Sequence, residues 1–177
     1  FRRVLFRSLD LKPSALFLVG RWDLYSNGWI RGGRLYHPTH FLTAQPTGDA
    51  TRETSRRALS KAVPETLASI RSSGIRAAVI FPPPLLRDSV TNRRKQPSEL
   101  EPTRAEHLEN VQSYRDAFSQ TDSVPVLDPT DRLCAERCGS SANGELLYID
   151  DNHLQAKGAM LLTDDLRTTL DALLSKK

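Results

Sequence analysis

The residues best suited to chemistry are an aspartate and a histidine three positions apart. Asp150 and His153 lie in the string Tyr148-Ile-Asp-Asp-Asn-His-Leu154, a polar segment that runs into a predicted helix. At this spacing a carboxylate can accept a hydrogen bond from the Nδ1–H of the imidazole, which fixes the tautomer and leaves Nε2 able to deprotonate a serine. The pair is therefore a candidate for two members of a Ser-His-Asp triad.

The same segment has a purely structural alternative. Asp150, Asp151 and Asn152 are residue types that commonly cap the N-terminus of a helix. The spacing alone favours neither interpretation.

Two cysteines, Cys134 and Cys138, precede this string, with three residues between them. A disulfide, a zinc site and two reduced thiols are all compatible with this spacing. Zinc is the least favoured of the three, because a zinc site needs further ligands and the remaining histidines, His37, His40 and His107, are scattered along the chain.

The elements that must position these residues begin with three short apolar runs. Residues 14–19 end at Gly20-Arg21-Trp22, residues 76–81 end at three prolines, and residues 124–128 form the last run. Continuous apolar runs of this length are typical of strands that are buried on both faces, as in a parallel sheet.

Segments with helical periodicity separate and follow these strands. Residues 51–73 predict a helix that Pro64 breaks or kinks and Gly74 ends. Thr103-Arg-Ala-Glu106 matches a capping box and starts a second helix. Residues 23–50 are rich in Gly, Pro, Asn and Thr and predict a long irregular connection. The tail predicts a helix with one apolar face, made of Ala159, Leu162, Leu166, Leu170 and Leu173.

Strands that alternate with helices predict an α/β domain of three layers, α/β/α, around a parallel sheet. Only three core strands are predicted, whereas an average sheet has about five or six. We therefore expect that the first strands are missing and that residues 9–177 are part of one domain.

The first eight residues, Phe1 to Ser8, match codon for codon one translated frame of a common sequencing adapter, and we expect residues 1–8 to be an artefact. A genuine basic arm is the alternative. The whole chain carries a formal charge of +4, but without the three arginines of residues 1–8 it has 22 basic and 21 acidic residues, a charge of +1.

Binding to nucleic acid needs a concentrated basic face, so this class of partner is disfavoured. No apolar run approaches the ~18 residues of a membrane span.

The Asp–His string resembles the last sequence block of the SGNH hydrolase family, whose signature there is Asp-x-x-His. It is most similar to the SGNH domain that is fused to the type-3 membrane acyltransferases of bacteria, which typically shows Tyr-x-Asp-Asp-x-His-Leu-Ser-x-x-Gly-Ala. Residues 148–154 and Gly158-Ala159 match this string, and Gln155 replaces the serine. The resemblance assigns Asp150 and His153 to the triad and implies a flavodoxin-like three-layer fold.

A second landmark of this subgroup is an Arg-Trp pair at the end of a buried strand, which Arg21 and Trp22 match. The wider family has Gly-x-Asn at this place, and its asparagine donates to the oxyanion. Gly20 and Trp22 occupy those positions here, so no asparagine side chain is available. The resemblance therefore leaves Arg21 or the indole N–H of Trp22 as a candidate oxyanion donor, with packing of Trp22 in the core as the alternative.

The family's nucleophile is the serine of a Gly-Asp-Ser turn after the first strand, which would lie upstream of residue 14. No such turn is present, and Gly48-Asp49-Ala50 lacks the hydroxyl. We therefore expect this chain by itself to be inactive as an esterase. The subgroup often carries a close cysteine pair, so the resemblance favours a Cys134–Cys138 disulfide and an oxidising compartment such as the periplasm.

The resemblance covers roughly residues 14–175 and implies a membrane O-acyltransferase. Its periplasmic SGNH domain would move acyl groups, often acetyl, onto cell-surface glycans such as lipopolysaccharide or peptidoglycan. The implied partners are a fused membrane acyltransferase domain, an acyl donor and a glycan acceptor, and neither a cofactor nor a metal is implied. A secreted SGNH esterase or lipase and a non-catalytic glycan-binding module are the alternatives.

Overall fold

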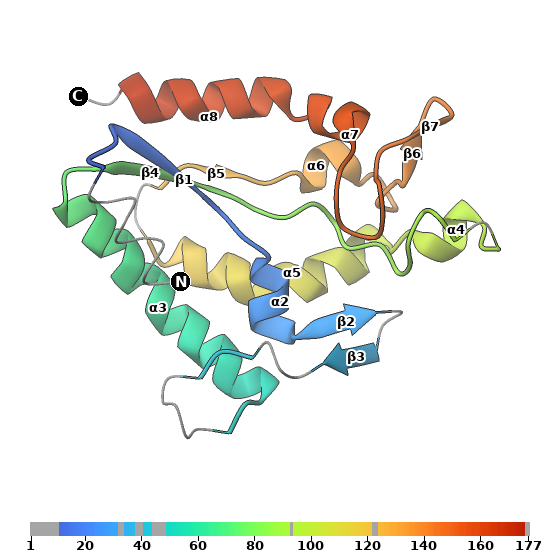
Figure 1. The fold of residues 1–177 in the computed structure, drawn as a ribbon, viewed down its shortest axis with the longest axis horizontal. Helices are drawn as coiled ribbons and strands as arrows, with labels where there is room; N and C mark the ends of the chain where they lie inside the picture. Colours follow the sequence, from blue (N-terminus) through green and yellow to red (C-terminus); the bar gives the residue numbers. More distant parts are fainter. Residues whose placement is uncertain are drawn as a thin grey trace.

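A parallel sheet forms the centre of the molecule, as the apolar runs predict (Figure 1). Its strands are β1 (Ala15–Val19), β4 (Arg76–Ile80) and β5 (Val126–Leu127), in the order β1-β4-β5. The central strand is β4, and its residues Ala78 and Val79 have no exposed surface. The computed structural model describes residues 11–31, 34–37, 41–43, 49–92, 94–121 and 124–175, so the predicted artefact over residues 1–8 lies outside the described residues.

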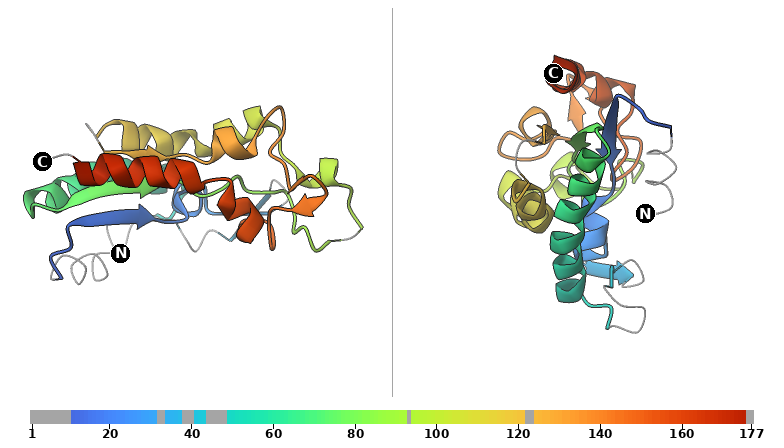
Figure 2. Two further views of the ribbon diagram at one scale, coloured as in Figure 1. Left: turned by 90° about the horizontal axis from the view of Figure 1, so that it is seen from above. Right: turned by 90° about the vertical axis from the view of Figure 1, so that its left-hand side faces the viewer.

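Helices cover both faces of this sheet (Figures 1 and 2). On one face lie α3 (Arg52–Ser72) and α5 (Arg104–Ser119), and on the other lies α8 (Thr163–Ser175). The order of layers is therefore helix, sheet, helix, which confirms the predicted α/β/α class.

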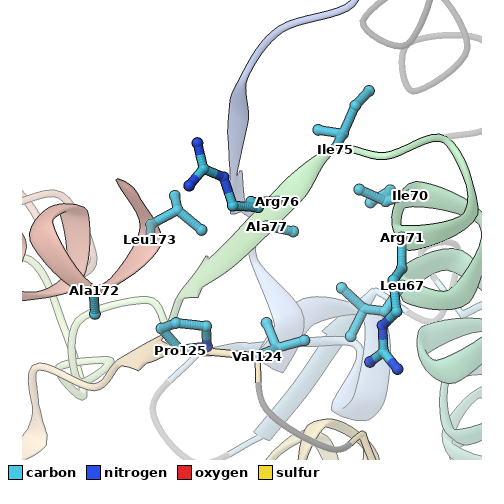
Figure 3. A pocket seen from close by; sticks show the side chains of 10 residues that line it. All are labelled: Leu67, Ile70, Arg71, Ile75, Arg76, Ala77, Val124, Pro125, Ala172 and Leu173. Atoms are coloured by element: carbon cyan, nitrogen blue, oxygen red, sulfur yellow. The ribbon is translucent and has the colours of Figure 1, made fainter. Parts of the chain in front are cut away.

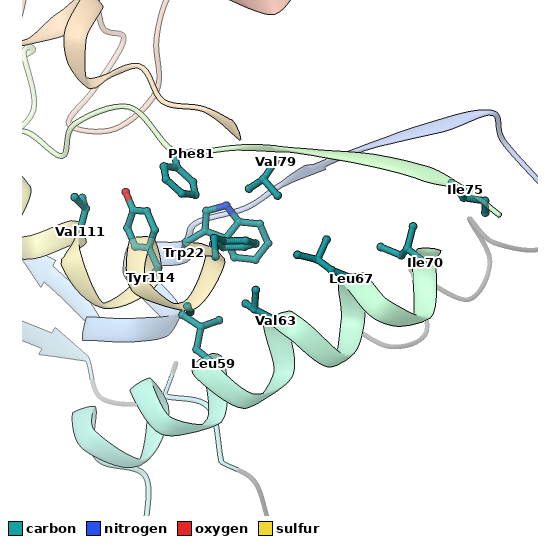
Figure 4. Close-up of a cluster of buried hydrophobic side chains, with 12 residues drawn as sticks. Trp22, Leu59, Val63, Leu67, Ile70, Ile75, Val79, Phe81, Val111 and Tyr114 are labelled. Atoms are coloured by element: carbon teal, nitrogen blue, oxygen red, sulfur yellow. The ribbon is translucent and has the colours of Figure 1, made fainter. Parts of the chain in front are cut away.

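The main hydrophobic core lies between the sheet and the pair α3 and α5 (Figure 4). The ring of Trp22 packs edge-on against Phe118, with 5.0 Å between the ring centroids. Phe81, just after β4, packs in the same manner against Tyr114, with 4.9 Å between centroids. The buried face of α3 has helical spacing and consists of Ser55, Leu59, Val63, Leu67 and Ile70.

Of the break or kink predicted at Pro64, the break is wrong, because α3 runs without interruption from Arg52 to Ser72. A proline removes only one backbone donor from a helix, whereas the buried apolar side chains of α3 lie on both sides of Pro64 and hold both halves against the sheet. The ends of α3 are as predicted. Thr51 caps the first turn by accepting a hydrogen bond from the backbone N–H of Thr54 at 3.1 Å, and Gly74 follows the last turn at a φ of +74°.

The predicted irregular connection over residues 23–50 is wrong in its first half. That half contains a short helix and an antiparallel hairpin, α2 (Trp22–Asn27), β2 (Trp29–Arg31) and β3 (Arg34–His37). The helix α2 escapes a search for apolar periodicity because Ser26 and Asn27, two of its buried residues, are polar. The amide of Asn27 is satisfied by a distant partner, since its Nδ2 donates to the carbonyl of Asn110 at 2.6 Å.

The capping box at Thr103 and Glu106 is confirmed. The backbone N–H of Glu106 donates to Thr103 Oγ1 at 3.1 Å, and the N–H of Thr103 donates to Glu106 Oε2 at 2.6 Å. A short helix, α4 (Pro97–Leu100), precedes α5. Between α5 and the tail, β5 is followed by the short elements α6 (Thr130–Leu133), β6 (Ser141–Ala142) and β7 (Glu145–Leu146).

The tail consists of two helices, α7 (Ala156–Met160) and α8. The apolar face predicted for it is buried only in part. Leu173 is buried together with Thr169, whereas Leu166 and Leu170 remain 41% and 37% exposed. This difference arises because α8 turns Thr169 and Leu173 toward the sheet, where it packs on β4 and β5. No helix in the described part of the chain is both long and apolar enough to cross a membrane.

Candidate active site

The Asp–His pair lies on the loop between β7 and α7, at the carboxyl ends of the parallel strands (Figure 1). His153 Nδ1 and Asp150 Oδ2 are 2.7 Å apart, which is a hydrogen bond between the two side chains. The imidazole is 69% exposed and the Asp150 side chain 38% exposed. With Nδ1 held by the carboxylate, Nε2 is the nitrogen that remains for proton transfer.

The second oxygen of Asp150 holds the backbone of the same loop. Its Oδ1 accepts hydrogen bonds from the backbone N–H groups of Asn152 and His153, each at 2.8 Å. Burial of Asp150 raises the pKa of its carboxyl, but these N–H groups and the His153 ring outweigh that effect and lower the pKa overall. Asp150 is therefore an anion at neutral pH.

This geometry differs from the helix-capping alternative for the segment. The N-cap of α7 is Gln155, and no side chain caps that helix end. The carboxylate of Asp150 instead closes the turn over Asn152 and His153 and orients the ring. Asp151 holds the loop from its other side, since its carbonyl accepts from the N–H of Leu86 at 2.8 Å.

Buried packing and backbone pairing fix the loop in place. The N–H of Ile149 donates to the carbonyl of His153 at 2.8 Å and closes the loop at its base. Tyr148 is 1% exposed, and its hydroxyl donates to the carbonyl of Pro84 at 3.1 Å. Burial raises the pKa of the Tyr148 phenol, so the hydroxyl keeps its proton and remains a donor. The pair thus projects from a well-anchored base.

The cysteines are joined in a disulfide, Cys134–Cys138, which is the pairing that the resemblance favours. Both cysteines are buried. The segment after Cys138 is joined to the segment before the Asp–His loop, because the N–H of Leu147 donates to the carbonyl of Ser140 at 2.9 Å. Within the described residues, no three metal-binding side chains come close enough together to hold a metal ion. The predicted loop histidine His40 and the side chain of His37 lie outside the described part.

The structure separates the two candidate oxyanion donors. Trp22 is 3% exposed, and its indole N–H donates to the carbonyl of Ile80 at 3.1 Å. The expectation that this N–H can reach an oxyanion is therefore wrong, because a packing role and a backbone partner occupy the ring. Arg21 lies near the pair, since the charges of Asp150 and Asp151 act on its guanidinium.

Two groups near the carboxyl ends of the strands were not predicted. Asp23 forms an ion pair with Arg21, and the only hint in the sequence is the opposite charge two residues away. Farther inside, His107 Nε2 lies 2.9 Å from Thr130 Oγ1, which donates in turn to Asp128 Oδ1 at 2.5 Å. His107 is buried and belongs to the structural interior, not to the exposed pair.

A cavity of about 320 Å³ lies at the opposite end of the sheet, around the first residues of β4 (Figure 3). Apolar side chains of α3 and α8 line it, among them Leu67, Ile70 and Leu173. Its position at the amino end of the strands separates it from Asp150 and His153, so it forms no part of this site.

No serine within the described residues is hydrogen-bonded to the His153 ring, whose bonded partner there is Asp150. The buried serines have other roles. Ser26 donates to the carbonyl of Asp23, Ser55 donates to that of Tyr25, and Ser140 donates to Glu101. Within the described residues, the candidate site therefore consists of the His153 imidazole and the Asp150 carboxylate.

Comparison with known proteins shows the family to which the chain belongs. A family model described as "SGNH domain (fused to AT3 domains)" matches residues 1–168. No curated protein and no solved structure matches the chain. The match covers nearly the whole chain, and the parallel sheet and its helices are those of an SGNH-like α/β fold. The chain therefore belongs to the family of SGNH domains that are fused to AT3 domains.

Proposed function

We propose that this chain supplies the histidine and the aspartate of a Ser-His-Asp acyl-transfer site. The observation that carries the proposal is the 2.7 Å contact between His153 Nδ1 and Asp150 Oδ2 beneath an imidazole that is 69% exposed. A structural histidine of this kind would be expected to bury its ring, whereas a general base needs one held nitrogen and one open nitrogen.

In the proposed mechanism, His153 Nε2 accepts the proton of a serine hydroxyl as the serine oxygen attacks the carbonyl of an acyl donor. The tetrahedral intermediate collapses, and the leaving group departs with that proton. The acyl-serine is then attacked by a sugar hydroxyl, whose proton His153 takes and returns to the serine. Asp150 remains an anion throughout and stabilises the imidazolium. Arg21 is the candidate donor to the oxyanion.

The open edge of β1 supports the idea that the serine comes from an additional strand of the same polypeptide. β1 pairs with β4 on one side, and Val19 at its end is 66% exposed. In the described residues the other edge of β1 has no partner strand, and such an edge presents backbone N–H and C=O groups that a further strand can bond. A strand added at this edge would end beside Gly20 and Arg21, next to the Asp–His loop. Residues 9–177 would then be part of one SGNH domain.

For the intact protein we propose the function that its family membership suggests. It is a membrane O-acyltransferase whose SGNH domain works in the periplasm and transfers acyl groups, acetyl among them, to cell-surface glycans such as lipopolysaccharide or peptidoglycan. The Cys134–Cys138 disulfide supports an oxidising compartment. A secreted esterase would use the same residues with water as the acceptor.

The test uses the protein encoded by the full open reading frame beside the chain of 177 residues. We expect the full protein to hydrolyse nitrophenyl acetate and to react with a fluorophosphonate probe at one serine. His153→Ala should abolish turnover, and the exposed control Asp164→Asn should not change it. Turnover that survives His153→Ala would refute the triad.

The chain of 177 residues should show no steady turnover by itself. A turnover by this chain that His153→Ala removes would overturn the expectation that its nucleophile lies elsewhere. A full protein that binds a surface glycan but labels at no serine would instead favour the non-catalytic binding module.

A further inference from the structure

Arg21 is bonded to one carboxylate, and the charges of two others act on it. Its Nε donates to Asp23 Oδ1 at 3.0 Å and its Nη2 donates to Asp23 Oδ2 at 2.8 Å, so one edge of the guanidinium is fully engaged. Burial lowers the pKa of Arg21, but the hydrogen bonds to Asp23 and the charges of Asp23, Asp151 and Asp150 together raise it. Two of these three carboxylates belong to the loop that carries His153.

We propose that Asp23 is a positioning residue that holds Arg21 away from Asp150, so that Asp150 stays bonded to His153 and the Nη1 edge of Arg21 is available to the acyl oxygen. The proposal rests on the function proposed above and adds a residue to it.

The reason is competition between two cations for one carboxylate. A guanidinium is always charged, and a two-point bond to a carboxylate is among the strongest polar contacts in proteins. Among the described residues, Asp150 and Asp151 are the other carboxylates whose charges act on Arg21, and they would be its acceptors without Asp23. A bond from Arg21 to Asp150 would displace the Nδ1–H of His153 and leave the tautomer of the ring undetermined.

Asp23 is well placed to prevent this exchange. Its side chain is 15% exposed, and that of Arg21 is 31% exposed. The helix α2 that carries Asp23 is anchored by its neighbour Trp22, which is buried in the core and donates to the carbonyl of Ile80. The carbonyl of Asp23 also accepts from the hydroxyl of Ser26 at 3.2 Å. The acceptor for Arg21 is therefore held in place by the core.

The first test is nitrogen NMR on the chain of 177 residues, with Asp23→Asn. We expect the wild-type Arg21 Nε–H to exchange slowly with solvent and the neutral His153 ring to carry its proton on Nδ1. In Asp23→Asn the slow exchange should be lost, and the nitrogen shifts of His153 should show a mixture of tautomers. The double variant Asp23→Asn with Arg21→Gln should restore the single tautomer, because the competing cation is gone.

A second variant guards against a folding defect in the first. Arg21→Lys keeps the charge but lacks the fork that Asp23 grips, so it should also produce mixed tautomers with Asp23 intact. If the His153 tautomer is unchanged in both variants, the positioning role is wrong. None of these readouts needs a serine or turnover, so they can fail while the triad, tested by His153→Ala in the full protein, still holds.

Discussion

A single carboxylate holds both the turn and the imidazole of the candidate site. Asp150 Oδ1 accepts two backbone N–H groups, and Oδ2 accepts the ring of His153. One oxygen holds the backbone of the turn, and the other holds the ring in the proposed mechanism. A substitution that keeps the shape of the side chain can therefore separate the two roles.

Asp150→Asn is that substitution. An asparagine oxygen can still accept the N–H groups of Asn152 and His153, so the free energy of unfolding should change by less than about 1 kcal/mol. The amide cannot stabilise an imidazolium or select its tautomer, and in the full protein we expect kcat to fall about 10²- to 10⁴-fold. Ester hydrolysis and urea unfolding of the same variant measure the two effects. An equal loss of stability and activity would contradict the separation of roles.

His107 gives the molecule a specific sensitivity to acid. Burial, with Arg115 and Arg104 adding to it, lowers the pKa of His107 to about 4 against an opposing contribution from Asp128. The unfolded chain, with a histidine pKa of about 6.5, binds this proton more readily than the folded chain. We therefore expect His107 to leave the free energy of unfolding unchanged above about pH 6.5. As the pH falls toward 4, protonation of His107 in the unfolded chain should lower this free energy by up to ~3 kcal/mol.

The matched variant for this prediction is His107→Gln, which keeps a polar group near Thr130 but does not titrate. Urea unfolding between pH 7 and pH 4 should show a shallower loss of stability in the variant than in the wild type. The carboxylates that titrate in the same range contribute equally to both proteins. Parallel pH profiles would show that His107 is not the group responsible.

At the scale of elements, the site depends on how closely α7 approaches the chain before the Asp–His loop. Gly158 in α7 faces the backbone of Leu147, and a Cβ added there would lie 2.3 Å from the Leu147 carbonyl oxygen and 2.9 Å from Leu154 Cδ2. The N–H of Gln155 donates to that same carbonyl at 3.0 Å. This contact sets the distance between the helix and the base of the loop.

Gly158→Ala should therefore destabilise the protein by about 1–3 kcal/mol, because backbone must move to admit the methyl group. Gly139→Ala is the matched control, since a Cβ there meets only the Ser141 carbonyl oxygen, at 3.4 Å. Thermal unfolding of both variants is the measurement. Equal midpoints for the two would mean that α7 does not pack on Leu147 as described.

At the scale of the whole molecule, one apolar face of α8 and the end of β1 are exposed in the described residues. α8 packs on β4 and β5, while its residues Leu166 and Leu170 and the end of β1 at Val19 remain exposed. We propose that the same additional strand that brings the serine also covers this face. The missing nucleophile and the uncovered surface would then have one explanation.

The double variant Leu166→Glu with Leu170→Glu tests this arrangement. In the chain of 177 residues both side chains are more than a third exposed, so we expect each change to lower the free energy of unfolding less than a change at a buried position does. In the full protein the same change should be strongly destabilising. Leu173→Glu, at a residue 3% exposed, should destabilise both proteins. A double variant that destabilises the short chain as much as Leu173→Glu would contradict the exposed position of this face.

The sequence alone determined what depends on neighbours along the chain. The buried spacing of α3, the capping box from Thr103 to Glu106 and the contact between Asp150 and His153 all join residues within one or two turns. Local steric preferences and short hydrogen bonds set such features, so spacing and residue type suffice to predict them. The family resemblance added the pairing of Cys134 with Cys138, which spacing left open.

Only the tertiary structure decided what depends on segments far apart in sequence. The indole of Trp22 bonds to Ile80, 58 positions away, and this contact turns a candidate oxyanion donor into a core residue. Pro64 stays helical because distant strands hold α3 on both sides of it. Asp150 and Asp151, far along the chain, are close enough for their charges to raise the pKa of Arg21. These outcomes depend on packing and on long-range hydrogen bonds, whose partners no local pattern reveals.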